Sequence, residues 1–559
     1  MTVSAGSPAD LAFGSFSENG PWVVDPDHLV WRGGIDALRR RTRGEVPQLL
    51  RRRRLPPGAR VVAVGVRLGW AVAAWYALDR GQGRERSRAG LSRRLRLAFE
   101  ALGPTYIKLG QILSSGQGIF PEELVSEFRL CRDQVPAEPF AAVKAIIEAD
   151  LGQPLSAVFS HMEEVPVAAA SIAQVHPARL VSGEEVVVKV QRPQVASLVR
   201  RDLAAMSWIA PALVGRIPVT ALANPPALVE LFAETIVEEL DFRLEAENML
   251  DVARVLSETG TRTTVVPRPH PRLVTRRVLV MERLDGFAWD DVAGMRAAGI
   301  DTSAVLRDGM VAFLEGAMLH GVFHGDLHGG NLFVQPDGRV ALLDFGITGR
   351  LEDPQRLAFL RLVMGGTVND LELQVSALRD LGALPPDTDI RAVIRDLDLE
   401  GPVQDPTQMT AEELTAQIRE LTKALLSYGA RMPKELMLFV KNMLFLDAAI
   451  ANLAPDLDLF AEVVRLAEYF ATRYGDRIAR EIGIDPRLAR VDLDGLRASM
   501  GLPPDVEGIT YRELQERREL IRRRMEEHAR RRERAQGTGG WIGWASRRAG
   551  RLVGRATRR

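Results

Sequence analysis

The chain has 559 residues, of which 46% are hydrophobic, enough for two to four domains and a substantial core. Its 73 basic and 73 acidic residues cancel, so net charge gives no support to general nucleic-acid binding. The single cysteine, Cys131, excludes an internal disulfide, and the first thirty residues lack the pattern of a secretory signal. We therefore expect a globular cytoplasmic protein without a nucleic-acid partner.

Residues 1–90 are predicted to form an N-terminal lead. Its first fifty residues carry many turn-forming side chains and little periodicity, so we expect them to be loosely ordered. Residues 61–78 are an apolar run interrupted by Arg67. Since an arginine inside a spanning helix costs about 2.5 to 3.5 kcal/mol, we favour a helix that lies on a membrane surface or packs on the body over one that spans the membrane, which the sequence leaves open.

Residues 91–160 are predicted to be a helical extension, because apolar side chains recur there with helical spacing. This segment contains Lys108 and Gln111. Lysine is rare in the chain, with 6 Lys against 67 Arg, and it reaches phosphates or carboxylates through gaps too narrow for arginine. Lys108 and Lys189 are therefore candidates for chemistry. The other four lysines are assigned no role, namely Lys144, Lys423, Lys434 and Lys441.

Residues 161–285 are predicted to form a sheet-containing lobe. Strand-like runs on either side of a Gly183-Glu184 turn indicate a hairpin. A small-residue loop precedes it where a phosphate-binding loop would lie, and it consists of Ala168, Ala169, Ala170 and Ser171. Neither a G-x-G-x-x-G nor a Walker A pattern is present, which excludes the P-loop class. Alanines restrict positive φ, so a nucleotide would be held differently from the way a protein kinase holds it.

Lys189 lies in the middle of the second strand of this hairpin, where a charge costs free energy unless it is paired. We predict that it contacts nucleotide phosphates and that Glu245, in a helical acidic segment over 227–255, holds it. The residues alone also allow Glu245 to lie on a solvated helix face. A buried strand ends in Met281 and Glu282, which are predicted nucleotide contacts.

The catalytic motif is His324-Gly-Asp326-Leu-His-Gly-Gly-Asn331, followed thirteen residues later by Asp344-Phe-Gly. Phosphoryl transfer needs one carboxylate at the incoming hydroxyl and oxygen ligands for magnesium. We assign Asp326 to the hydroxyl or water, and Asn331 and Asp344 to the metal. With Lys189, Asp326 and Asn331 form the predicted catalytic set. Two short strands joined by a turn separate Asn331 from Asp344.

The rest of the chain is predicted to be helical. Residues 286–475 form the second lobe, and the short step from Gly346 to a helix start at Asp353 leaves no platform for a peptide substrate. Residues 476–559 form a charged tail with a helix over 511–535. The tail ends in a basic segment containing two tryptophans, which suits either anionic lipid headgroups or a disordered end.

These motifs resemble the UbiB-like (AarF/ADCK) family of atypical kinases. The resemblance covers about residues 91–350 and rests on the alanine-rich loop, the catalytic motif and three short blocks: Lys108-Leu-Gly-Gln111, Val188-Lys189-Val-Gln-Arg-Pro193 and Glu239-Leu-Asp241. It implies an α+β, bilobal protein-kinase-like fold with an N-terminal helical extension over the active site and a helical C-terminal extension. Lys108 and Gln111 would be regulatory residues of this extension, and Glu239 and Asp241 the acidic pair that holds it.

The resemblance also implies ATP and Mg²⁺ as cofactors. The expected function is a membrane-associated ATPase or small-molecule kinase that supports prenylquinone or other isoprenoid-lipid metabolism. Its partners would be a membrane lipid or isoprenoid-type small molecule and lipid-pathway proteins, at the inner face of the cell membrane. A nucleotide-binding scaffold and an aminoglycoside or choline phosphotransferase are the alternatives. Gly330 departs from the family pattern, which commonly has proline there, and the tail lacks the paired transmembrane helices of some members.

Overall fold

The computed structural model describes residues 15–17, 20–51, 54–114, 121–131, 136–213, 225–398, 428–430, 433–488, 491–499, 502–503, 505–520 and 523. The chain divides into two compact units. The first comprises Met1–Arg356 with Met432–Ala449, and the second comprises Leu357–Arg431 with Ile450–Arg559. Each unit is described by itself.

The N-terminal segment is ordered from residue 20 to residue 51, so the prediction of a loose lead is wrong there. Two short 3-10 helices, η1 (Pro26–His28) and η2 (Val30–Arg32), precede helix α2 (Ile35–Leu49). The indole N–H groups of Trp22 and Trp31 donate to the carbonyls of Pro269 and His270 over 3.1 and 3.2 Å. Such isolated aromatic anchors have no period along the sequence, so pattern reasoning did not detect them.

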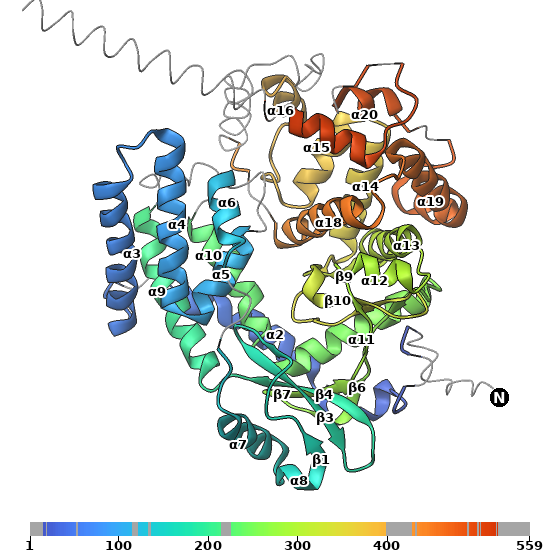
Figure 1. The fold of residues 1–559 in the computed structure, drawn as a ribbon. Helices are drawn as coiled ribbons and strands as arrows, with labels where there is room; N and C mark the ends of the chain where they lie inside the picture. The colour runs from blue at the N-terminus through green and yellow to red at the C-terminus, as the bar shows by residue number, and fades with distance from the viewer. Residues whose placement is uncertain are drawn as a thin grey trace, which may run out of the picture. The chain divides into compact units, whose positions relative to one another are not determined.

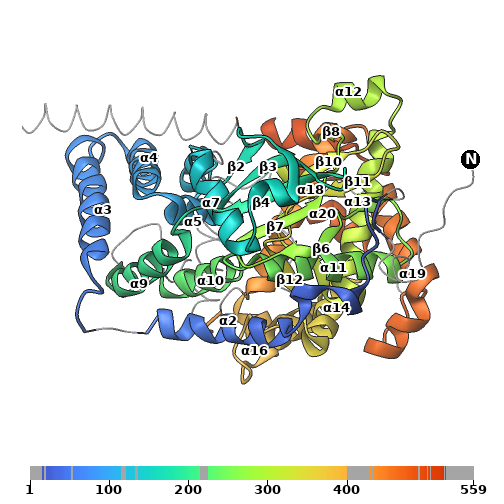
Figure 2. The same ribbon diagram turned by 90° about the horizontal axis from the view of Figure 1, so that it is seen from below.

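A helical layer lies beside the sheet of the first unit (Figures 1 and 2). It contains α3 (Ala59–Leu78), α4 (Arg84–Leu102), α5 (Pro104–Ser114), α6 (Glu122–Phe128), α9 (Val195–Leu213) and α10 (Pro225–Glu238). Buried apolar side chains from α3, α4, α5, α9 and α10 share one core, with Val64, Tyr106, Leu203 and Phe232 among its members. Helix α6 contributes Leu124 and Phe128 to a smaller cluster. The predicted helix over 61–78 is present as α3, which packs on α4 and α9.

A six-stranded antiparallel sheet follows, with the order β1-β3-β4-β7-β6 and β2 paired with β3. Its strands are β1 (Phe159–Met162), β2 (Ala168–Ala169), β3 (Ala173–Leu180), β4 (Glu185–Gln191), β6 (Pro269–Val274) and β7 (Val278–Glu282). One face packs on α7 (Phe140–Leu151) and α8 (Leu155–Val158) through an apolar cluster that includes Ile147, Val188 and Val280. Helix α11 (Phe242–Glu258) contacts β6 and β7, and its Glu245 pairs with Lys189 of β4.

The predicted acidic helix over 227–255 is two helices, α10 and α11. The helix is interrupted at residues 239–241. There the Asp241 side chain accepts a hydrogen bond from the backbone N–H of Arg243 and caps α11. An aspartate at this position satisfies an otherwise unpaired N–H of the first turn and interrupts the preceding helix.

The catalytic motif lies among short strands. The elements around it are β5 (Thr264–Val265), β8 (Phe287–Ala288), α12 (Val292–Ala297), α13 (Thr302–Glu315), a π-helical turn (Gly316–His320), β9 (Val322–His324), a 3-10 turn (Gly329–Asn331), β10 (Leu332–Val334), β11 (Val340–Leu342) and β12 (Thr348–Arg350). Strands β10 and β11 pair antiparallel, as predicted, and β9 pairs with β12. Helix α18 (Lys434–Leu453) packs here, where Phe439 stacks on Phe313 at 5.3 Å.

The second unit is helical, in agreement with the prediction for residues beyond Asp353. Its helices are α14 (Asp353–Thr367), α15 (Leu371–Asp380), α16 (Ile390–Asp396), α19 (Leu459–Ile482) and α20 (Leu493–Ser499), and residues 511–520 are also helical. The remainder of the predicted tail helix, the basic end, Lys423 and the segment 399–427 lie outside the described residues.

Candidate functional site

Lys189 lies between two carboxylates. Its Nζ is 2.7 Å from Oε1 of Glu245 on α11 and 3.1 Å from Oδ1 of Asp344. Burial lowers the pKa of Lys189, but the charges of Asp344 and Glu245 outweigh this effect and raise it. Burial raises the pKa of Glu245 to about 7, although Lys189 opposes that shift. The structure therefore brings together the strand lysine, the helix carboxylate and the Asp-Phe-Gly carboxylate, and it removes the solvated-face alternative for Glu245.

Asp344 is held at the turn after β11. Its Oδ1 accepts the backbone N–H of Gly346 over 2.9 Å, and the next side chain, Phe345, is fully buried. The Nδ2 of Asn248 donates to the Phe345 carbonyl over 2.8 Å, which fixes this turn against α11. Burial raises the pKa of Asp344, but the charges of Lys189 and Lys108 lower it by more. The net pKa is below its ordinary value, so the group is ionised. Its side chain is 42% exposed, which leaves it accessible to a ligand.

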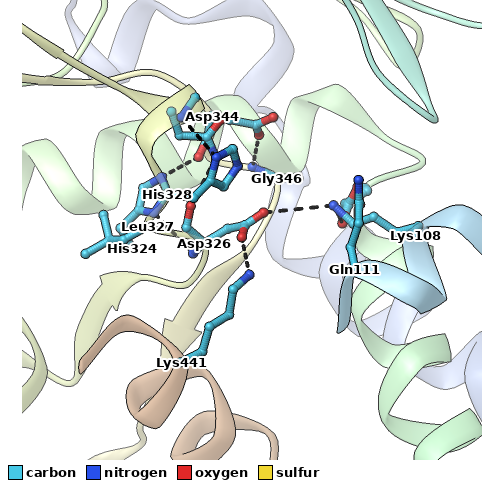
Figure 3. Close-up of polar contacts among 12 residues, drawn as sticks. Lys108, Gln111, His324, Asp326, Leu327, His328, Asp344, Gly346 and Lys441 are labelled. Carbon is cyan, nitrogen blue, oxygen red and sulfur yellow. Dashed lines mark hydrogen bonds and ion pairs between the residues drawn. The ribbon is translucent and has the colours of Figure 1, made fainter. Parts of the chain in front are cut away.

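Asp326 lies between two lysines, as Figure 3 shows. Lys441 of α18 forms an ion pair with Oδ1, and the Nζ of Lys108 on α5 is 4.0 Å from Oδ2. The same Lys108 Nζ is 3.0 Å from Oε1 of Glu239. Burial raises the pKa of Asp326, but Lys441 and Lys108 reverse this shift and hold it well below its usual range.

His324 links the two carboxylate residues through their backbone. Its Nε2 donates to the carbonyl of Asp344, and its Nδ1 accepts the N–H of Asp326 over 3.2 Å. Burial lowers the pKa of His324 to about 4, so the imidazole is neutral, as this pair of contacts requires. Asn442 of α18 supports the same loop: its Nδ2 donates to the His324 carbonyl, and its Oδ1 accepts the N–H of Leu327 over 3.0 Å.

Comparison with known proteins identifies the family. Residues 130–376 match the ABC1 atypical kinase-like domain. An uncharacterised protein of Mycobacterium tuberculosis is 36% identical over 67% of this chain and 76% of its own length. An aarF domain-containing protein kinase of Arabidopsis thaliana, named as chloroplastic, is 32% identical over 66% of this chain and 73% of its own. A protein of Aeromonas hydrophila named as a probable protein kinase UbiB is 33% identical over 67% and 69%.

The chain belongs to the UbiB-like family of atypical kinases. This membership and the mixed helix and sheet structure confirm the predicted α+β kinase-like fold class. The helical extension reaches the candidate site, because Lys108 on α5 contacts Glu239 and lies next to Asp326.

In this UbiB-like chain the other two predicted regulatory residues, Gln111 and Asp241, lie in different surroundings. Gln111 lies one turn after Lys108 on α5 and is partly buried, and Figure 3 shows the two side chains close together. Asp241 pairs with Arg243 at 2.7 Å and caps α11. Thus Glu239 contacts the extension, whereas Asp241 pairs with Arg243 in the first turn of α11.

Hydrogen bonds from Arg192 hold the alanine-rich loop in place. Ala168 and Ala169 pair with Val175 and Gln174, and the Ala170 N–H donates to the Ala173 carbonyl over 2.9 Å. The Arg192 Nε donates to the Ala170 carbonyl, and its Nη1 donates to the Pro136 carbonyl, both over 2.8 Å. The adjacent Ser171 is buried. The loop is therefore a short, fixed turn.

Met281 and Glu282 point to opposite faces of the sheet. Met281 pairs with Val187, two residues from Lys189, so its side chain shares the Lys189 face. Glu282 lies on the other face, where its carboxylate bonds to Ser17 and to the Arg268 N–H. The Glu282 side chain is therefore not brought to Lys189, and a nucleotide contact there is limited to its backbone.

The sequence interpretation missed Lys441 and Asn442. Lys441 was assigned no role, but it pairs with Asp326, 115 residues earlier in the chain. Lys434 also has a partner, Glu238, at 3.4 Å. The scarcity of lysine, with 6 in the whole chain, is the one signal in the sequence that points to Lys441.

The oxygen donors at the site fit a magnesium–nucleotide complex. Asp344 presents a partly exposed carboxylate, and the Asn331 Nδ2 donates to the Asp326 carbonyl over 3.0 Å, which orients its amide in the loop. Among the described residues no group of three or more His, Cys, Asp or Glu side chains forms a metal site. Mg²⁺ typically takes one or two carboxylates together with phosphate oxygens and water, so this small donor set suits it.

Proposed function

We propose that the chain is an ATP- and Mg²⁺-dependent atypical kinase that acts as an ATPase or a small-molecule phosphotransferase. The observation that carries this proposal is the position of Lys189 between Glu245 and Asp344. An ammonium group in this setting stays charged and fixed in direction, which is what binding of nucleotide phosphates requires.

The proposed nucleotide site is the face of the sheet that carries Lys189. Lys189 contacts the phosphates, Glu245 orients it, and Asp344 and Asn331 hold the metal. Bound Mg²⁺ would neutralise charge on the phosphate oxygens. The fixed loop of Ala168, Ala169, Ala170 and Ser171 covers the nucleotide, and Met281 faces it from β7.

The proposed acceptor site lies around Asp326, which orients a hydroxyl group or a water for attack. Lys108, with Gln111 and Glu239, occupies the side where a peptide would enter, so a small acceptor is favoured. The Asp326 carboxylate is shared by two lysines, which lowers its proton affinity and makes it a weak base. Slow turnover follows from this arrangement.

We propose peripheral association with the inner face of the cell membrane and a role in prenylquinone or related isoprenoid-lipid metabolism. Membership of the UbiB-like family supports the pathway. Among the described residues two helices, α3 and α18, are long and apolar enough to cross a membrane by length and composition. The buried share of the apolar window is 17% for α3 and 33% for α18, so α3 is the better candidate for membrane contact.

A second candidate function is a nucleotide-binding scaffold for lipid-pathway proteins. The contacts of Asp326 favour it, since a carboxylate bound by Lys441 and Lys108 is not free to act. Phosphate release by the wild type and by Asp326→Ala, both with anionic lipid vesicles, separates the two. Equal rates would favour the scaffold.

The test of the leading proposal is Asp344→Asn, which keeps the shape and removes the charge. We expect binding of a fluorescent ATP analogue in the presence of Mg²⁺, and phosphate release, to be abolished. Asp285→Asn is the matched control, because the Asp285 side chain is 80% exposed and pairs with Arg283. Retention of nucleotide affinity and turnover in Asp344→Asn would overturn the proposal.

A further inference from the structure

An apolar cavity of about 810 Å³ lies among helices α3, α4, α5, α6, α9 and α10. Among the described residues that line it none is charged, and Leu68, Phe99, Leu109, Phe128 and Ile209 are typical members. The volume is within the range of about 300–1,000 Å³ that small-molecule sites occupy. The cavity is open to solvent along α3, where Val72 and Tyr76 are exposed, so an apolar molecule has both space and access.

Two glycines of α3 keep the cavity open. Gly65 and Gly69 both line it, and a Cβ added at either position would meet nothing within 4 Å. Neither glycine has a positive φ, so no backbone conformation requires glycine there. A larger side chain would also favour the helix. The glycines therefore leave space beside α3, which a bound molecule would use.

The cavity continues into an exposed apolar surface of α3. Val72 and Tyr76 line the cavity and are also exposed, and Trp70, 72% exposed, lies on the same helix. The guanidinium of Arg80 is 4.6 Å from the Tyr76 ring. Exposed tryptophan and tyrosine next to arginine are typical of a surface that meets lipid headgroups and acyl chains. Such a surface would admit the apolar chain of a lipid.

We propose that this cavity binds the single apolar chain, acyl or prenyl, of a membrane lipid that enters along α3. Helix α5 connects the cavity to the proposed phosphotransfer site. Its Tyr106, Leu109 and Leu113 line the cavity, whereas Lys108 of the same helix contacts Glu239. A bound chain that shifts α5 changes the distance from Lys108 to Asp326, and this regulatory consequence rests on the proposed function.

The test is binding of cis-parinaric acid, a fluorescent fatty acid, to the full-length protein. We expect saturable binding to the wild type and a loss of affinity of at least about tenfold in Gly69→Leu and Gly65→Leu, since a leucine side chain fills the space of several methylene groups. Gly44→Leu in α2 is the matched control: Gly44 also has nothing within 4 Å, it does not line the cavity, and its variant should bind as the wild type does.

Absence of saturable binding to the wild type would overturn the proposal. Equal affinity in Gly69→Leu and the wild type would also overturn it, provided that thermal unfolding shows both proteins to be folded. Either result would mean that the chain itself, or another protein, covers this surface. Asp344→Asn should bind cis-parinaric acid as the wild type does. Failure of nucleotide binding and failure of lipid binding are thereby measured on separate variants.

Discussion

At one end of the polar site a lysine lies between two carboxylates, and at the other end a carboxylate lies between two lysines. Lys189 contacts Glu245 and Asp344, whereas Asp326 is next to Lys441 and Lys108. The first end therefore has one ammonium group beside two carboxylates, of which Asp344 is ionised and Glu245 has a pKa raised to about 7. The second end has two lysines around Asp326, and one of them, Lys108, also pairs with Glu239. The lysine at the first end is thus fixed for binding an anion, whereas the candidate base at the second end is held by ion pairs.

The largest expected effect concerns the first end. In Lys189→Arg the planar guanidinium cannot take the place of a compact ammonium group between Glu245 and Asp344. We expect phosphate release to fall by about 10²–10³-fold, the range seen when one electrostatic contact to a developing charge is lost. Lys434→Arg is the control, because Lys434 pairs with Glu238 instead. A rate in Lys189→Arg equal to that of the control would remove the distinction between the two ends.

His324, which joins the backbones of Asp344 and Asp326, should make the stability of the fold sensitive to acid. The His324 pKa is about 4 in the folded state against an ordinary value of 6.5, so the unfolded chain binds the proton more tightly. The stability that neutral His324 contributes is present above pH 6.5 and is lost as the pH falls toward 4. Between pH 7 and pH 5 we expect a loss of about 2 kcal/mol in the free energy of unfolding.

Urea unfolding at the two pH values measures this loss. His324→Gln should remove most of the difference, since it leaves no buried imidazole to protonate. His161→Gln, at an exposed position of β1, should retain it. An unchanged pH dependence in His324→Gln would show that other groups cause the acid sensitivity.

A smaller effect is expected at the second end. Lys441→Met keeps the length of the side chain and removes one of the two charges that lower the Asp326 pKa. The acidic limb of the pH–rate profile should move to higher pH, and turnover at neutral pH should rise by about tenfold because Asp326 becomes a stronger base. Lys434→Met, on the same helix, is the control. A fall in turnover would instead place Lys441 among the groups that stabilise the transferred phosphoryl.

The smallest expected effect links the acceptor end to the apolar cavity. Anionic lipid vesicles should stimulate phosphate release by the wild type by about fivefold, a typical coupling between two sites. Gly69→Leu should show little stimulation and an unchanged basal rate, whereas Gly44→Leu should respond as the wild type does. Equal stimulation in both variants would show that the cavity does not affect turnover at the acceptor end.

The local motifs of the site could be predicted from the sequence because each is short and continuous. The alanine-rich turn, the strand lysine and the loop from His324 to Asp344 each have a pattern that backbone geometry imposes over a few residues. The hairpin strands β10 and β11 also follow from a turn between two apolar runs. Glu245 was identified as a candidate, but the sequence left open whether it faced Lys189 or solvent, since an acidic helix face looks the same in both cases.

Only the tertiary structure decided which distant groups share the site. Lys441 and Asn442 belong to a helix whose apolar spacing predicts burial, and nothing local indicates that they reach the loop at Asp326 and Leu327. Which of Met281 and Glu282 shares the face of Lys189 likewise depends on strand register. The sequence by itself determined the chemistry of the phosphotransfer loop, because those residues are neighbours along the chain. The packing of helices determined the charges around Asp326 and the cavity beside α5, because burial brings together residues more than a hundred positions apart.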